Sequence, residues 1–329
     1  MLTLAGLGAA GAGCARKPTA KAGQVLKVGD QRGAAHALMT AAGVLNDTPY
    51  QIQWVQMPAA APLLEALSAG AIDLGGVGGA PFAFAYSSGA PIKAVLASRL
   101  RTVAPGLGHS SAIIVRRGST IRTLADLRGR KLATIKGSSG HDVALRLLEK
   151  ARVDPKSVKF VFLNNGDAKA ALDSGDIDAW STWGTYVGIA VEENGDRILA
   201  DAEGLVIPGA VAGFQAASDA AIATKAPLLR DFLGRLTRAH AWVKTHPEAY
   251  AAQIAKETGV PLSVARYSVA SALSSEYAPI DADLLEDQRK TLERYRAAGV
   301  IDTLPKLGGG YITTFSDVAQ ASQPAKAVG

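Results

Sequence analysis

A single cysteine, Cys14, is present among the 329 residues of the chain. One thiol allows no disulfide within the chain, no metal site built from several cysteines and no dithiol redox pair. Aromatic residues are also few, at 6%, while glycine is abundant, a balance typical of chains with many short turns. Hydrophobic residues make up 48% and charged residues 19%, which excludes a disordered chain and predicts a packed core.

Catalytic and metal-binding motifs are missing as well. The histidines, at positions 36, 109, 141, 240 and 246, form no metal-ligand spacing, and no phosphate-binding Walker loop occurs. His109–Ser111 and Ser138–His141 place serine beside histidine, but neither has the glycine-flanked turn that exposes a serine nucleophile. We therefore expect a protein that is not an enzyme and that uses no metal and no cofactor.

Clusters of basic residues are also missing. The formal net charge is +6, from 35 lysines and arginines against 29 acidic residues. The basic residues are scattered, with no Lys/Arg run, zinc-finger spacing or basic recognition helix, so nucleic acid is not expected as a partner. The excess of positive charge favours anionic ligands over cationic ones.

The most continuous apolar stretch stands at the start of the chain. Met1–Gly13 is apolar or small except for Thr3, too short to span a bilayer but suited to the apolar part of a secretion signal. Its ending resembles a bacterial lipoprotein cleavage site, although Gly11 replaces the usual leucine and no basic segment precedes the run. We expect residues 1–23 to be an export signal, with either a lipid anchor at Cys14 or an ordinary cleavage site beside an incidental cysteine.

Strand-like and helix-like segments alternate from residue 25 onward. Such alternation predicts an α/β fold with mainly parallel sheets covered by helices. The predicted strands are 25–30, 51–56, 72–74, 112–116, 131–135, 158–163, 177–180 and 211–217. The predicted helices are 34–45, 62–70, 141–151, 167–174, 227–244, 247–258, 261–273 and 281–298.

A short internal repeat suggests two related lobes. Leu67–Asp73 and Leu172–Asp178 share the frame Leu-x-x-Gly-x-Ile-Asp, and each reads as a helix end, a glycine cap and a strand start. A tight turn explains this pattern without any function, so Asp73 and Asp178 are expected to be structural.

The two lobes are expected to be joined by two crossings, near residues 111–115 and 211–215. On this division residues 24–110 and 216–329 form the first lobe, and residues 111–215 form the second. Two crossings make a hinge, and a cleft between two α/β lobes is a natural site for a small molecule.

Ligands of α/β lobes bind beyond the carboxyl ends of the strands, so the loops there are candidates. They are residues 30–33, 57–60, 78–80, 136–141 and 180–183. Lys136–His141 is the richest, since its glycines allow close approach, its serines carry hydroxyls and the following helix offers unpaired N–H groups to an anion. Alternatively, Ser138 or Ser139 simply caps that helix.

Other candidates have equally plain structural alternatives. Trp180 and Trp183 could form an apolar pocket wall or belong to the core. Arg32 could neutralise an anion or be a solvated surface residue. His141 could donate a hydrogen bond to a ligand or serve the structure alone.

The same segments resemble the aliphatic-sulfonate-binding proteins of bacterial ABC importers, within the wider nitrate/sulfonate/taurine-binding group. The matching stretches are Gln53–Ala59, Leu64–Gly75, Lys136–His141 and Gly175–Trp183, and the resemblance extends over about Gly23–Thr314. The Lys-Gly-Ser-Ser-x-His segment is typical of the sulfonate branch, while the Leu-x-x-Gly-x-Ile-Asp turn is shared more broadly.

This resemblance implies a two-lobed periplasmic-binding-protein fold of type II that closes around an anion. The implied ligand contacts are Gln31, Arg32, Gly33, Pro58, Ala59, Gly78, Gly79, Ser138, Ser139, His141, Trp180 and Trp183. The family often has aspartate where this chain has Gly79, and Trp-Asp-Pro where it has Trp183-Gly184-Thr185. Losing two carboxylates implies a roomier, less acidic pocket, suited to a bulkier or aromatic sulfonate or another organic anion.

The resemblance further implies a monomeric, periplasmic protein that is soluble or held to the membrane only at its N-terminus and that delivers a sulfonate to an ABC importer permease. Two rivals use the same fold. Related enzymes act on organosulfur or pyrimidine-type substrates through a cysteine-bearing site, whereas Cys14 lies in the expected export signal. An effector-binding regulatory domain would need an attached helix-turn-helix, and the residues before Val25 are too few and too apolar for one.

Overall fold

The computed structural model describes residues 23–101, 111–205 and 211–320. Cys14 and the rest of the expected export signal up to residue 22 lie outside these ranges. Across the described ranges, no helix is both long enough and apolar enough to cross a membrane.

The first lobe is built on a six-stranded sheet in the order β11-β4-β10-β3-β1-β2. Its strands are β1 (Val25–Gln31), β2 (Gln51–Met57), β3 (Leu74–Gly78), β4 (Ile92–Leu100), β10 (Val211–Ser218) and β11 (Ser275–Ala278). β1, β2 and β3 are parallel, whereas β10 runs antiparallel to both β3 and β4.

The second lobe is built on a five-stranded sheet in the order β7-β6-β8-β5-β9. Its strands are β5 (Ser111–Val115), β6 (Lys131–Thr134), β7 (Lys159–Phe162), β8 (Ala179–Trp183) and β9 (Arg197–Asp201). β6, β7 and β8 are parallel, and β5 is antiparallel to β8 and β9. The two-lobed α/β fold is thus confirmed, with sheets that are mixed rather than mainly parallel.

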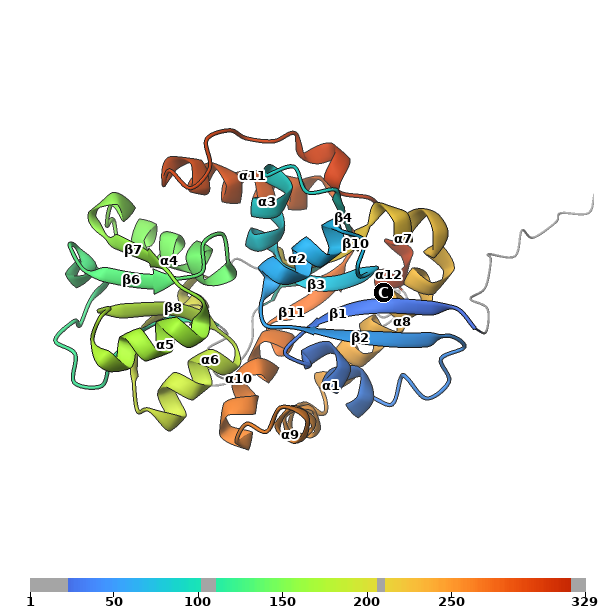
Figure 1. Ribbon diagram of the computed structural model, residues 1–329, viewed down its shortest axis with the longest axis horizontal. Helices are drawn as coiled ribbons and strands as arrows, with labels where there is room; N and C mark the ends of the chain where they lie inside the picture. The colour runs from blue at the N-terminus through green and yellow to red at the C-terminus, as the bar shows by residue number, and fades with distance from the viewer. Residues whose placement is uncertain (1–22, 102–110, 206–210, 321–329) are drawn as a thin grey trace, which may run out of the picture.

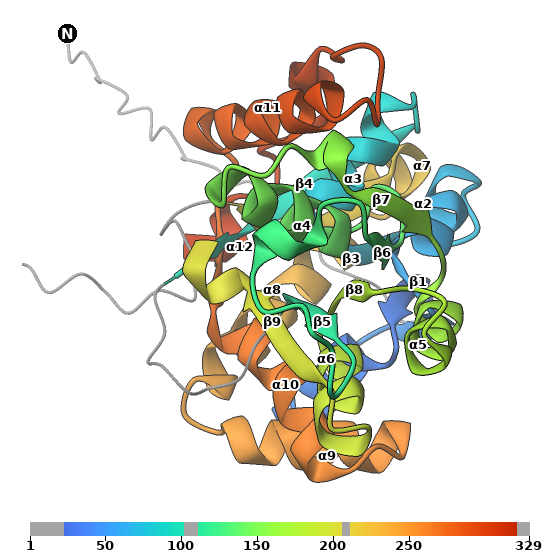
Figure 2. The same ribbon diagram turned by 90° about the vertical axis from the view of Figure 1, so that its left-hand side faces the viewer.

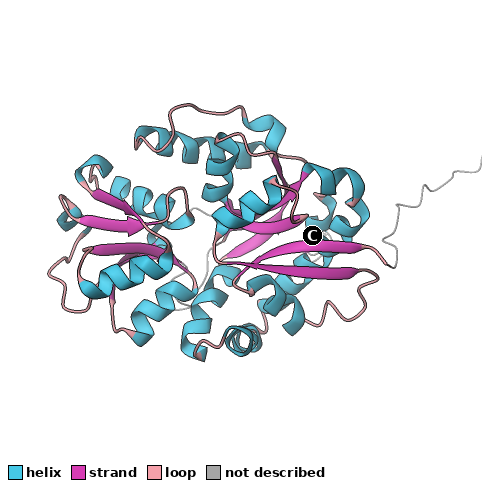
Figure 3. Ribbon diagram, in the orientation of Figure 1, coloured by secondary structure: helices cyan, strands magenta, loops and turns pink. Residues whose placement is uncertain are grey.

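Helices flank both sheets, which lie at opposite ends of the molecule (Figures 1 and 3). The helices are α1 (Ala34–Ala41), α2 (Ala60–Ser68), α3 (Gly79–Ser87), α4 (Ser139–Lys150), α5 (Asn165–Ser174), α6 (Thr185–Gly188), α7 (Asp219–Thr224), α8 (Ala226–Val243), α9 (Pro247–Thr258), α10 (Leu262–Leu273), α11 (Ala282–Ala297) and α12 (Asp317–Gln320). Separate clusters of buried apolar side chains cover the two faces of each sheet. Each lobe therefore has its own core.

The strand-like segments expected to be crossings are instead parts of sheets. Residues 111–115 form β5 of the second sheet, and residues 211–215 begin β10 of the first. The chain passes from the first sheet to the second between β4 and β5, and it returns before β10. The boundary expected at residue 215 therefore differs from the sheet assignment, which puts Val211 and the rest of β10 in the first lobe.

Strand β3 runs through the glycine-rich segment after Leu74 to Gly78, beyond the end predicted at residue 74. Gly75 has no room for a side chain, because a Cβ there would lie 2.8 Å from Leu63 Cδ2 and 3.0 Å from the Gly29 carbonyl oxygen. Glycine is normally rare in strands, but here it lets a central strand pack closely against α2. Helix α3 begins directly at Gly79, so residues 78–80, predicted as a loop, are the end of a strand and the start of a helix.

The internal repeat has the same structural role in both lobes. The carboxylate of Asp73 accepts the backbone N–H of Lys27 at 2.7 Å, and that of Asp178 accepts the N–H of Lys131 at 2.8 Å. Each aspartate also donates its own N–H to the carbonyl of the same lysine. The repeat thus ties the start of one parallel strand to its neighbour, as the structural interpretation predicted.

Helix α11 belongs to the first lobe but also reaches the second. It lies above α3 and beside α4 (Figures 1 and 2). Arg294 Nη1 donates to Asp142 Oδ1 of α4 at 2.8 Å, and the Tyr295 hydroxyl donates to the carbonyl of Ser138 at 3.3 Å. These contacts hold the first turn of α4 against the first lobe.

Candidate ligand cleft

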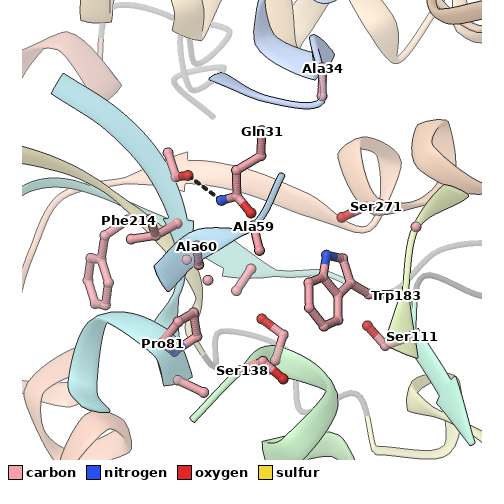
Figure 4. Close-up of a pocket in the computed structure, with 18 of the residues that line it drawn as sticks. Gln31, Ala34, Ala59, Ala60, Pro81, Ser111, Ser138, Trp183, Phe214 and Ser271 are labelled. Carbon is pink, nitrogen blue, oxygen red and sulfur yellow. Dashed lines mark hydrogen bonds between the residues drawn. The ribbon is translucent and has the colours of Figure 1, made fainter. Parts of the chain in front are cut away.

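A cavity of about 1000 Å³ lies between the lobes. The first lobe lines it with residues that follow β1, β2 and β3, and the second lobe lines it with Lys136–Ser139 and Trp183–Tyr186. In Figure 4, Trp183 and Ser138 face Gln31, Ala59 and Pro81 across this space. Volumes of roughly 300–1000 Å³ are usual for small-molecule sites, so a ligand of considerable size has room here.

Arg32 brings a positive charge to this cavity. Its backbone has φ 56, a left-handed conformation that side chains other than glycine adopt at a cost of about 1–2 kcal/mol. Its Nη1 donates to the Tyr186 hydroxyl of the opposite lobe at 2.6 Å, while its buried Nε has no hydrogen-bond partner within the described chain. No carboxylate of the described residues forms an ion pair with it, so the guanidinium can still neutralise an anion.

The serine loop, Lys136–Ser139, leads into α4. Ser138 is the N-cap and its hydroxyl accepts the N–H of His141 at 3.2 Å, so the capping interpretation of this serine holds. Ser139 begins the helix, where the N–H groups have no acceptor within the helix and the dipole is positive. A cap and an anion site can share these residues, because capping uses only one of the free donors.

Two of the carboxylates that line the cavity, Asp30 and Asp142, are already engaged. Asp30 accepts the N–H groups of Ala35 and His36 at 3.0 and 2.9 Å. Asp142 pairs with Arg294 and, at 3.8 Å, with Arg146. Burial raises the pKa of both carboxyls, although these partners oppose the rise. Arg32 therefore keeps a charge that neither Asp30 nor Asp142 neutralises, and Lys136, whose Nζ lies 5.9 Å from the Phe162 ring centroid, adds a second cation to the cavity lining.

Apolar side chains form much of the remaining wall. Trp183, Phe214 and Pro58 line the cavity, with small residues between them. Gly184 follows Trp183 with φ 58 and ψ −135, a conformation open to glycine but strained for other residues. The turn after Trp183 therefore favours glycine.

Eight of the predicted contacts line the cavity. They are Gln31, Arg32, Pro58, Ala59, Gly78, Ser138, Ser139 and Trp183. Gln31 is already engaged through its amide nitrogen, which donates to the carbonyl of Gly76 at 2.7 Å (Figure 4).

Four predicted contacts lie away from it. Gly33 is the N-cap of α1, and the side-chain direction of Gly79 is filled by Val211, whose Cγ1 would be 2.6 Å from a Cβ. Trp180 is fully buried in the core of the second lobe. His141 is 1% exposed and sits behind the serine loop. Gly79, Trp180 and His141 thus turn toward protein, and Gly33 is outside the residues that line the cavity.

Several lining residues were not predicted. Tyr186 on α6 accepts a hydrogen bond from Arg32, and Gln215 on β10 donates to the Tyr277 hydroxyl at 3.1 Å. Ser271 on α10 faces the cavity (Figure 4). A signal existed for Gln215 alone, because it is the single amide in the otherwise small and apolar strand Val211–Ser218.

We expect acid to destabilise the fold, because two histidines, His141 and His240, are buried. Burial, with a smaller effect of Lys136, lowers the pKa of His141 to about 4, and burial lowers that of His240 to about 4 as well. The usual value is 6.5, so as the pH falls the unfolded state binds these protons before the folded state does. We expect the free energy of unfolding to fall by roughly 1–3 kcal/mol per histidine between pH 6.5 and 4.

Unfolding by urea at pH 7, 5.5 and 4.5 measures this loss. The fall in the free energy of unfolding from pH 7 to pH 4.5 should be smaller in His240→Gln than in the wild type. In the control His246→Gln, which replaces an exposed histidine, this fall should equal that of the wild type. Asp30 and Asp142 have raised pKa values and act in the opposite direction, but equally in all three proteins. An equal drop in all three would show that burial of His240 does not set the acid response.

Comparison with known proteins agrees with this architecture. The model of the family described as "NMT1/THI5 like" matches residues 51–250. A putative aliphatic sulfonates-binding protein of Escherichia coli is 30% identical over 275 residues, 83% of each chain. The alkanesulfonate-binding protein SsuA of Xanthomonas axonopodis pv. citri, solved with MOPS bound, is 28% identical with a TM-score of 0.77, covering 89% of this chain and 99% of that one.

Two α/β lobes around a shared cleft define the periplasmic-binding-protein fold, and this molecule has it. The chain belongs to the NMT1/THI5-like family. The same fold also occurs in the desulfurization enzyme DszB, solved with biphenyl-2-sulfinic acid, at 15% identity and a TM-score of 0.64. At that identity the likeness concerns the fold alone.

Proposed function

We propose that the protein is the substrate-binding component of an ABC-type importer and that it captures an organic sulfonate by closing its lobes. The observation that carries the proposal is a cationic side chain without a carboxylate partner among the described residues, Arg32, in the same cavity lining as the start of α4. A sulfonate has three acceptor oxygens and one negative charge, which suits a guanidinium together with helix N–H groups.

The proposed contacts are the cavity-lining residues of both lobes. Arg32 and the serine loop take the sulfonate oxygens, while Trp183, Pro58 and Phe214 take the apolar part of the ligand. Relatives named as sulfonate-binding proteins support this choice of ligand. The paired state of Asp30 and Asp142 supports an anion over a cation, and the cavity volume favours a bulky alkyl or aryl group.

Closure needs interactions that exist only when the lobes meet. Arg32 with Tyr186 and Tyr295 with Ser138 are such contacts, since each joins one lobe to the other. A ligand held by Arg32 and Ser139 would add to them. The proposed setting is the periplasm, with a membrane permease as partner and a monomer as the working form, and lipid attachment at Cys14 remains part of the proposal.

Thermal unfolding and calorimetry test the proposed ligand class on protein that has been unfolded and refolded to remove bound solute. Ethanesulfonate and benzenesulfonate at 100 times their Kd should stabilise the fold by about 2.7 kcal/mol, or roughly 5 °C. Propionate and benzoate, their carboxylate analogues, should stabilise the fold less at the same concentrations, because a carboxylate has one oxygen fewer for the donors.

A pair of serine variants tests the place of binding. Ser139→Ala removes a cavity hydroxyl and should weaken sulfonate binding about 5- to 10-fold, whereas Ser157→Ala, outside the cavity, should leave it unchanged. If neither sulfonate binds while another anion does, the ligand class is wrong but an importer role stands. If a solute is consumed and not merely bound, the protein is an enzyme.

A further inference from the structure

His141 stands directly behind the serine loop and contacts it without reaching the cavity. Its Nδ1 accepts the backbone N–H of Gly137 at 3.1 Å. Its ring packs against Phe160, Phe162 and Tyr295, with centroid distances of 5.2, 5.3 and 5.5 Å. The His141 side chain is therefore fixed by three aromatic rings and by a hydrogen bond from the backbone of the serine loop.

The Gly137 N–H needs such an acceptor because of the loop's shape. Gly137 has φ 72, which turns the chain between β6 and α4, and its N–H cannot join either element. A buried backbone N–H without a partner costs about 1–3 kcal/mol. Since burial lowers the pKa of His141, the ring is neutral at neutral pH, with a lone pair on Nδ1 and the proton on Nε2.

Residues of the first lobe contact Gly137, Ser138 and His141. The Tyr295 hydroxyl reaches the carbonyl of Ser138 while its ring packs on His141. Phe84 of α3 covers Gly137 so closely that a Cβ there would lie 2.5 Å from its Cγ. The contacts that join the lobes here are therefore made on the serine loop itself and on the His141 ring behind it.

We propose that His141 is a positioning residue for anion binding, which fixes Gly137 by accepting its N–H and so presents Ser138 and Ser139 to the ligand without touching it. This role rests on the proposed function, because the ligand it serves is the sulfonate. It replaces the direct ligand contact that the family resemblance implied for His141, which the position of the ring outside the cavity does not favour.

Two substitutions separate positioning from simple packing. His141→Phe keeps an aromatic ring for Phe160 and Tyr295 but leaves the Gly137 N–H without an acceptor. His141→Asn loses the ring but keeps an acceptor, because asparagine Oδ1 is bonded to Cγ just as histidine Nδ1 is. A residue that only fills space would lose binding and stability together, and more in asparagine than in phenylalanine.

The experiment measures three quantities in the wild type and both variants. They are ethanesulfonate affinity by calorimetry, the melting temperature of the ligand-free protein and hydrogen exchange of the Gly137 amide. We expect His141→Phe to bind about 10-fold more weakly, to melt within a few degrees of the wild type and to exchange the Gly137 proton at least 10-fold faster. His141→Asn should melt lower, yet keep affinity within about threefold and Gly137 protected.

The opposite pattern overturns the inference: affinity and Gly137 exchange unchanged in His141→Phe, or affinity lost equally in both variants. If the wild type binds no sulfonate, the proposed function fails by itself. Hydrogen exchange of the Gly137 amide in the ligand-free protein then tests the role of His141 by itself. Slow exchange in the wild type and in His141→Asn, with fast exchange in His141→Phe, supports the role of the ring nitrogen. Equal exchange in all three contradicts it.

Discussion

Replacing Arg32 with glutamine is expected to weaken sulfonate binding at least 100-fold. The guanidinium lines the cavity with no carboxylate partner among the described residues and no acceptor for its buried Nε. Hydrogen bonds to charged groups contribute about 1.5–3 kcal/mol each, and 2.7 kcal/mol corresponds to a factor of 100. Calorimetric titration with ethanesulfonate measures the change.

Two controls make this result specific. Arg32→Lys keeps the charge but loses the planar fork, so it should recover part of the affinity and not all of it. Arg130→Gln removes an arginine from the surface of the second lobe, where it pairs with Asp178 at 3.6 Å, and should leave binding unchanged. Affinity within threefold of the wild type in Arg32→Gln would mean that the anion binds elsewhere.

Replacing Gly78 with valine is expected to abolish binding by keeping the lobes apart. Gly78 lies at the end of β3, and a Cβ there would be 2.3 Å from the Ser139 hydroxyl oxygen of the opposite lobe. Rotation of the Ser139 side chain could relieve a clash with the single methyl group of alanine, but not a clash with the branched side chain of valine. The backbone φ of −63 is ordinary for any residue, and Pro81 of the same lobe would lie 3.2 Å from the Cβ, a milder contact than the one with Ser139, so most of the strain arises when the lobes close.

Small-angle scattering and calorimetry together test this block. The wild type should contract when ethanesulfonate is added, while Gly78→Val should remain at its ligand-free radius of gyration and bind at least 100-fold more weakly. Its melting temperature without ligand should stay within a few degrees of the wild type. Gly308→Val is the matched control, because Gly308 has no atom within 4 Å of its Cβ position. Contraction of Gly78→Val on ligand addition would contradict closure at this point.

The fold was largely readable because local signals agreed with the tertiary structure. Helix α9 was predicted at its observed bounds, since Pro247 marks its start and Gly259, with φ 72, its end. The strand β3 was not, because glycine is normally a signal against strands and its use there depends on how closely α2 packs. Such packing is a property of two elements together and leaves no mark in either segment alone.

The site was readable only where a loop follows a strand. Gln31, Arg32 and Ser139 were found in this way and do line the cavity. Trp180 and Trp183 were predicted together, yet residues three apart on β8 point to opposite faces, so one is in the core and the other in the cleft. Tyr186 was missed because its meeting with Arg32 depends on how the two lobes are placed.

A crystal structure with 4-bromobenzenesulfonate would locate the bound anion. Anomalous scattering from bromine fixes the orientation of the ligand independently of the protein. We predict the sulfonate oxygens within hydrogen-bond distance of the Arg32 guanidinium and the Ser139 N–H, with the bromine end toward Trp183. A sulfonate that contacts neither Arg32 nor the serine loop would contradict the proposed anion site.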